Sequence, residues 1–156
     1  MKNSNSSSNT SAAIPNWILL IVLITSFAGF LDSIYLTAKH YAGDIPECTL
    51  LEGCEEVLTS SYSEIFGIPV ALFGSIFYFT ILILGLLYFD TKKKQFIQAI
   101  IPLTFLGFAG TLYFLYLQAF VIGSWCQFCL ISAATSTILL ETGILIWIRT
   151  AKPRPR

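Results

Sequence analysis

Four long apolar runs, separated by short polar stretches, dominate the pattern along the chain. They cover residues 14–38, 65–89, 96–122 and 125–148. As a helix, each run is long enough to cross the ~30 Å hydrocarbon core of a bilayer at a rise of ~1.5 Å per residue. The pattern therefore predicts an all-α membrane protein, a four-transmembrane-helix bundle with a longer loop between the first two spans.

Composition agrees with this pattern. Of the 156 residues, 55% are hydrophobic and only 12% are charged. A soluble domain of this length cannot bury so much apolar surface, so the excess must face lipid. We expect a disordered cytoplasmic tail at 1–13, a membrane domain at 14–150 and a basic cytoplasmic tail at 151–156. The chain has no dense basic patch with stacking aromatic residues, so a nucleic-acid partner is not predicted.

Basic residues predict the orientation in the membrane. Every Lys and Arg except Lys39 lies near a terminus or in the linker between the second and third runs: Lys2, Lys92, Lys93, Lys94, Arg149, Lys152, Arg154 and Arg156. Positive residues favour the cytoplasmic side, so both termini should be cytoplasmic. The acidic loop at 39–64 should then lie on the periplasmic or other extracytoplasmic side.

The four cysteines form two pairs. Cys48 and Cys54 lie in the long outer loop, and Cys126 and Cys129 lie at the start of the fourth run. The first and third loops of a four-span protein are on the same side, so the two pairs share a face. The predicted orientation makes this the oxidising side, where disulfides form.

The two pairs differ in their local chemistry. Cys126 and Cys129 form a CxxC motif that opens a helix, and residues three apart share a helical face. A helix N-terminus stabilises a thiolate, as a nucleophilic dithiol requires. Cys48 and Cys54 lie among carboxylates in ECTLLEGCEE, where like charge disfavours a thiolate. A mobile pair beside a fixed pair suggests a shuttle that passes electrons inward.

Other interpretations of the cysteines stay open. The loop pair could be a structural disulfide, and the CxxC could be a packing pair. Four cysteines could also bind zinc, but an oxidising face disfavours free thiolates and the loop's carboxylates favour harder cations, so we predict no metal site. The alternative function is therefore a non-enzymatic four-span membrane protein with two structural disulfides.

The order of motifs resembles the vitamin K epoxide reductase family. The resemblance is carried by Cys48 and Cys54, Ser60 six residues later, SIYLTAKH at the end of the first span, GIPVALFGSIFYF at the second and WCQFC at the fourth. The other quinone-coupled disulfide oxidases, the DsbB proteins, have their CxxC in the first outer loop and match less well. Because the chain stops at Arg156 without a thioredoxin-like domain, it resembles the stand-alone bacterial members.

The resemblance implies an enzyme, a quinone-dependent disulfide oxidoreductase. Its bacterial members reoxidise a periplasmic thioredoxin-fold protein and pass electrons to a membrane quinone, such as ubiquinone or menaquinone. Cys48 and Cys54 match the shuttle pair, and Cys126 and Cys129 match the active-site pair, with Cys129 nearest the quinone. The partner is expected to be a separate, DsbA-like protein.

The resemblance also implies a quinone pocket. The residues expected to line it are Ser60, Leu58, Val70, Phe73 and Ala133. Val70 and Ala133 stand where the vertebrate enzymes have Asn and Tyr, so reduction of vitamin K epoxide is not predicted. Asp32 and Glu141 are carboxylates inside predicted spans, which marks both as functional hypotheses. For Asp32, a proton path to the quinone and a hydrogen-bonded packing role both stay open.

Overall fold

Four long helices form the molecule in a computed structural model that describes residues 14–46, 48 and 53–151. They are α1 (Asn16–Ala42), α3 (Val70–Thr91), α4 (Lys94–Tyr116), continued by the π-helical segment η1 (Leu117–Ile122), and α5 (Gln127–Ala151). All four are long and apolar enough to cross a membrane, which confirms the predicted fold class. The tails expected at 1–13 and 152–156 lie outside the described residues.

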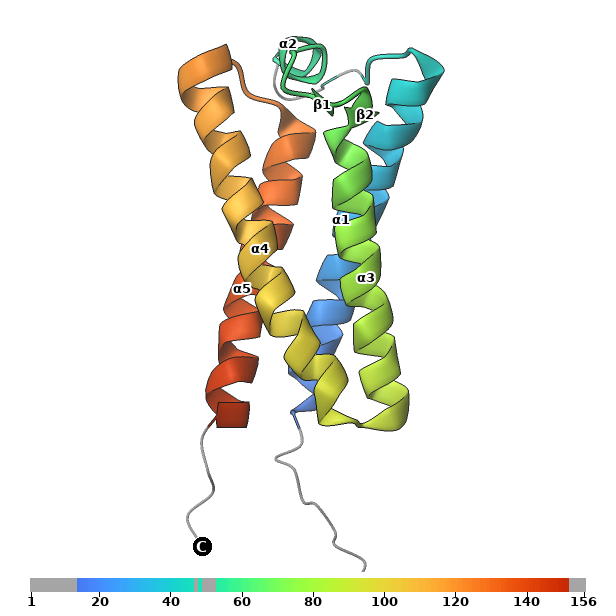
Figure 1. Cartoon of the computed structure of the whole chain (residues 1–156), viewed down its shortest axis with the longest axis vertical. Coiled ribbons are helices and arrows are strands. Elements are labelled where there is room, and N and C mark those ends of the chain that lie inside the picture. Colours follow the sequence, from blue (N-terminus) through green and yellow to red (C-terminus); the bar gives the residue numbers. More distant parts are fainter. Residues whose placement is uncertain (1–13, 47, 49–52, 152–156) are drawn as a thin grey trace, which may run out of the picture.

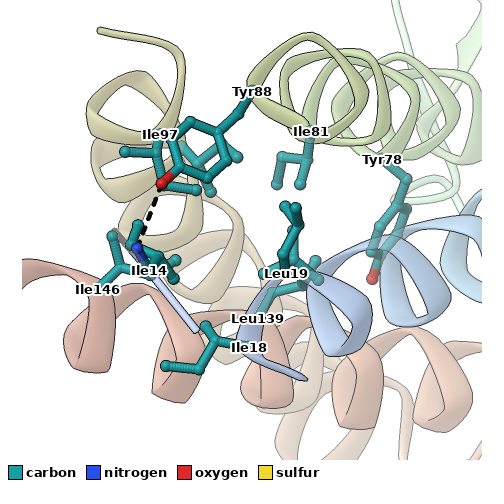
Figure 2. Packing of buried hydrophobic residues seen from close by; sticks show 11 residues of the cluster. Ile14, Ile18, Leu19, Tyr78, Ile81, Tyr88, Ile97, Leu139 and Ile146 are labelled. Carbon is teal, nitrogen blue, oxygen red and sulfur yellow. Dashed lines mark hydrogen bonds between the residues drawn. The ribbon is translucent and has the colours of Figure 1, made fainter. Parts of the chain in front are cut away.

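The bundle core lies where all four helices meet. Ile18 of α1, Ile81 of α3, Ile100 of α4 and Leu139 of α5 are fully buried. Figure 2 shows Ile18, Ile81 and Leu139 in this core. It also shows the Ile14 N–H, which donates to the Tyr88 hydroxyl at 3.3 Å. Many large apolar side chains remain exposed on the outside of the helices. This arrangement suits a bundle whose outer surface faces lipid.

The second span begins later than its apolar run predicts. Residues Glu64–Ile65 (β1) pair antiparallel with Ile68–Pro69 (β2) ahead of α3. The turn between them places Phe66 at φ 54° and Gly67 at φ 76°, both left-handed. The Val70 N–H then donates to the Ser63 carbonyl at 2.9 Å. The expectation of a span from residue 65 was wrong, because this hairpin uses the first residues of the run.

The cysteine-bearing loops gather at one end of the bundle. The short helix α2 (Cys54–Leu58) lies across that end in Figure 1, close to the hairpin. The connector between η1 and α5, residues 123–126, is at the same end. The α3–α4 linker and both ends of the described chain lie at the other end (Figure 1). Lys92, Lys93, Lys94 and Arg149 are therefore remote from the cysteines.

Candidate active site

A contact between two buried sulfurs joins the loop to the CxxC motif. Cys48 and Cys54 form a disulfide, while Cys126 and Cys129 are free thiols. The Cys126 Sγ lies 3.6 Å from the Cys54 Sγ. Cys54 is 2% exposed and Cys126 is fully buried, and both pack around Val57 of α2. Disulfide exchange requires a thiolate beside a disulfide sulfur, and this contact supplies that proximity.

Two features hold α2 against the connector at residues 123–126. The backbone of Gly53 lies so close to it that an added Cβ would meet the Trp125 nitrogen at 2.8 Å and the Ser124 Cβ at 2.9 Å. The Ser124 hydroxyl also donates a hydrogen bond to the Glu56 carboxylate. Any larger residue at position 53 would push Cys54 away from Cys126. Glycine is therefore required here for close approach rather than for backbone freedom.

The CxxC motif spans the beginning of α5, with Cys126 directly before the helix and Cys129 in its first turn. The Cys126 carbonyl accepts the Leu130 N–H at 3.0 Å, and the Cys129 N–H points at the Cys126 Sγ at 3.5 Å. Cys126 lies just before the membrane-spanning helix. The Cys129 thiol donates a hydrogen bond that lowers the pKa of Cys126, and the N–H groups of Phe128 and Cys129 lower it further. This is the direction expected for a thiol at a helix N-terminus.

Gln118 is a site residue that the sequence reasoning missed. Its Oε1 accepts the Cys126 N–H at 3.0 Å, and its own carbonyl accepts the Gly123 N–H at 3.0 Å. The side chain is 2% exposed and belongs to η1. π-Helical segments often occur at functional sites, because the extra residue per turn re-aims a side chain. The available signal was an amide near the outer end of a mainly apolar run.

A cavity of about 980 Å³ opens below the cysteines. Of the four cysteines, all within the described part of the chain, Cys129 alone is among its lining residues. The cavity is also lined by every residue expected in the quinone pocket: Leu58, Ser60, Val70, Phe73 and Ala133. Residues from all four long helices, α2 and the hairpin contribute to its wall. The sulfurs are thus ordered from the loop through Cys126 to the cavity.

Asp32 takes part in a polar cluster beside this cavity. The Ser132 hydroxyl donates to the Asp32 carboxylate at 2.7 Å, which joins α1 to α5 inside the membrane. The Tyr78 hydroxyl donates to the Ser132 carbonyl and lies 2.9 Å from the Thr135 hydroxyl. Ser132 and Tyr78 line the cavity, so the cluster borders it. The Ser132–Asp32 hydrogen bond gives Asp32 a packing role between α1 and α5.

His40 and Glu64 lie at the rim of the same cavity. The His40 Nε2 is 3.4 Å from the Glu64 Oε1, which joins the end of α1 to β1. Lys39, directly before His40 in α1, forms an ion pair with Asp44. Glu141 is exposed on α5, and nothing in the described contacts links it to the cysteines. Glu52, in the acidic loop, lies outside the described residues.

The fold and this site define a class of protein: a multi-pass membrane protein in which two cysteine pairs meet above an apolar cavity. Residues 20–143 match the model of the Vitamin K epoxide reductase family, and the chain belongs to that family of membrane enzymes. It is 33% identical over 114 residues to Thiol-disulfide oxidoreductase LTO1 of Arabidopsis thaliana. That alignment covers 68% of this chain but 30% of the plant protein, so the chain spans under a third of this relative's length.

Proposed function

We propose that this protein is a membrane thiol-disulfide oxidoreductase that reoxidises a separate extracytoplasmic thioredoxin-fold protein and passes the electrons to a membrane quinone. The observation that carries the proposal is the 3.6 Å contact between Cys54 and Cys126, with Cys129 next in line on the cavity wall. Two structural disulfides would not need this contact. The plant relative's name, a thiol-disulfide oxidoreductase, supports the same activity.

The first step opens the loop disulfide from outside. Cys48 is partly exposed whereas Cys54 is buried, so a thiolate of the reduced partner attacks Cys48. Cys54 leaves as a thiolate, and the bond between Cys48 and the partner forms. The partner's second thiol then displaces Cys48, and the partner departs as a disulfide. Both loop cysteines are now reduced, and the partner has lost two electrons.

The second step transfers the electrons inward. The Cys54 thiolate attacks Cys126 of a Cys126–Cys129 disulfide, which forms a Cys54–Cys126 bond and releases Cys129 as a thiolate. Cys48 then attacks Cys54, re-forms the loop disulfide and releases Cys126. A leaving thiol of low pKa departs faster, so the backbone N–H groups of Phe128 and Cys129, which lower the pKa of Cys126, favour this release.

The cavity suits the acceptor. Its volume of about 980 Å³ and its mainly apolar wall resemble those of small-molecule sites. We propose that Leu58, Ser60, Val70, Phe73 and Ala133 hold a quinone there. When bound, the quinone supplies an acceptor for two electrons and two protons, which come from the two CxxC thiols. Cys129 is the thiol placed to deliver them, because it lines the cavity.

Anaerobic reduction of a soluble quinone by the purified protein, with dithiothreitol as the electron donor, tests this function. We expect turnover by the wild type and none by Cys129→Ser, whose bundle should stay folded because apolar packing holds it together. Ser26→Ala is the matched control, since Ser26 is buried but bonds only to its own helix, at the Val22 carbonyl. Turnover by Cys129→Ser would contradict the assignment. A wild type that never reduces a quinone, with disulfides that resist mild reductant, would favour two structural disulfides.

A further inference from the structure

Ser136 has a buried hydroxyl that is left without a partner. Its Oγ is, within the described residues, the one buried side-chain oxygen or nitrogen that makes no hydrogen bond. The residue is 3% exposed and lines the cavity. Burying an unpaired hydroxyl costs free energy, so an unsatisfied one in a native protein calls for an explanation. A ligand that accepts its proton would provide that explanation.

The neighbouring hydroxyl groups show that the helix does not force the Ser136 hydroxyl to stay without a hydrogen-bond partner. On α5, Thr135, Thr137 and Thr142 each donate to a carbonyl four residues earlier, at 2.8–3.1 Å. Such a bond back to the helix is the usual solution for a hydroxyl inside an apolar helix. Two other hydroxyls on the cavity wall are also engaged, because the Tyr78 hydroxyl donates to the Ser132 carbonyl and the Thr80 hydroxyl donates to the Ile76 carbonyl. Ser136 therefore retains a donor that its neighbours have already used.

Ser136 also has a suitable position relative to the reactive sulfur. It follows Cys129 by seven residues on α5, which is two helical turns, so both residues are on one face at a separation of ~10 Å along the axis. Ala133 lies between them, and all three line the cavity. The side chain of Ala133 is small, so α5 itself places little bulk between Cys129 and Ser136 on the cavity wall.

We propose that Ser136 donates a hydrogen bond to the quinone carbonyl that is remote from Cys129. The ligand class is a para-quinone, because its two carbonyls lie at opposite ends of the ring. One end then faces the Cys129 thiol while the other accepts from the Ser136 hydroxyl. This inference rests on the proposed function and deepens it, since it assigns a residue that fixes the ring's position and selects for a carbonyl.

The test compares ligand binding by the wild type, Ser136→Ala and the control Ser26→Ala. Binding is measured in detergent as the dissociation constant for menadione, from quenching of tryptophan fluorescence, and as the menadione-induced rise in melting temperature. We expect Ser136→Ala to bind menadione about tenfold more weakly, the equivalent of ~1.4 kcal/mol. 2-Methylnaphthalene has the same fused ring without carbonyls, so it should bind the wild type and Ser136→Ala equally.

Stability without ligand separates a binding role from a structural one. Ser136→Ala removes an unpaired hydroxyl, so its melting temperature should equal or exceed that of the wild type. Ser26→Ala removes a satisfied hydrogen bond, so it should melt slightly lower and bind menadione like the wild type. Equal menadione affinity in Ser136→Ala and the wild type would overturn the inference and leave the proposed function intact. A wild type that binds no quinone would overturn both.

Discussion

Gln118 shows how one polar side chain in an apolar helix can set the geometry of a reactive pair. The Cys126 N–H is buried at the start of α5, where helix geometry provides no intrahelical acceptor. Gln118 provides one from the end of the preceding helix, at 3.0 Å. The amide thereby fixes the backbone of Cys126 relative to Cys54. We regard Gln118 as a positioning residue, because it acts on the sulfur through the backbone.

Replacing Gln118 by Met should slow exchange between the two cysteine pairs. The Met side chain has a similar length but lacks the amide oxygen, so a buried N–H is left unsatisfied at a cost of ~1–3 kcal/mol. The measurement is the rate of Cys54–Cys126 disulfide formation in protein that retains only these two cysteines. Gln118→Glu keeps an oxygen acceptor and should restore most of the rate. A wild-type rate in Gln118→Met would refute the positioning role.

At this scale, the sequence predicts chemistry but not contacts. The two cysteine pairs could be recognised because the spacing and neighbouring charges of each pair lie within one short segment of the sequence. Gln118, Ser136 and Gly53 could not, because each is defined by what a distant segment places beside it. Glycine at 53 matters only because Trp125 lies against it, and nothing within the loop sequence shows this.

The short helix α2 is the element that connects the outer loop to the active site. It carries Cys54 at its first position, and its Glu56 bonds to Ser124 of the connector. The loop was expected to be a mobile shuttle, yet its second cysteine is 2% exposed and lies against the CxxC. Docking of α2 therefore already brings the Cys54 sulfur into contact with the Cys126 sulfur.

Loss of the Glu56–Ser124 hydrogen bond should weaken this docking. We expect Glu56→Ala to slow Cys54–Cys126 disulfide formation about two- to fivefold, since a bond between exposed groups contributes ~0.5–1 kcal/mol. Glu55→Ala is the matched control. Glu55 is the adjacent exposed carboxylate on the same helix, and its replacement by Ala removes the same charge. In Ser124→Ala, the further change Glu56→Ala should have no added effect. Equal slowing by Glu55→Ala would show that net charge, rather than the contact, is responsible.

Spans were easier to predict at this scale than the elements between them. A long apolar run admits only one backbone solution in lipid, a helix whose N–H and C=O groups are all paired. The hairpin at Glu64–Pro69 lies at the end of the bundle, where the backbone does not have to be helical. Its apolar residues continue the apolar run of the second span, so the sequence pattern did not separate them from that span. Phe66 in a left-handed conformation offered no sequence signal, because non-glycine residues seldom adopt it.

The whole molecule separates two chemically distinct ends. The cysteines, α2 and the hairpin lie at one end (Figure 1), while Lys92, Lys93, Lys94 and Arg149 lie at the other. The positive-inside rule favours a cytoplasmic location for the basic end. We propose this orientation because it places the cysteine pairs in an oxidising compartment with access to a secreted partner.

Single cysteines introduced at the two ends test the orientation. In a cysteine-free background, Glu55→Cys on α2 and Lys93→Cys in the α3–α4 linker are both exposed positions. A membrane-impermeant thiol reagent should label Glu55→Cys in intact cells and Lys93→Cys only after the membrane is opened. The reverse pattern would place the cysteine pairs in the cytoplasm and contradict the proposed partner.

The central claim is that electrons cross from the loop to the helix between Cys54 and Cys126. The most direct measurement is disulfide formation in three proteins that each retain one loop cysteine and one CxxC cysteine, with the others changed to Ser. The retained pairs are Cys54 with Cys126, Cys48 with Cys126, and Cys54 with Cys129. Under a mild oxidant, mass mapping should show that the first pair forms its disulfide fastest and most completely, because its sulfurs are already 3.6 Å apart. Equal rates in all three proteins, or no bond between Cys54 and Cys126, would contradict the account.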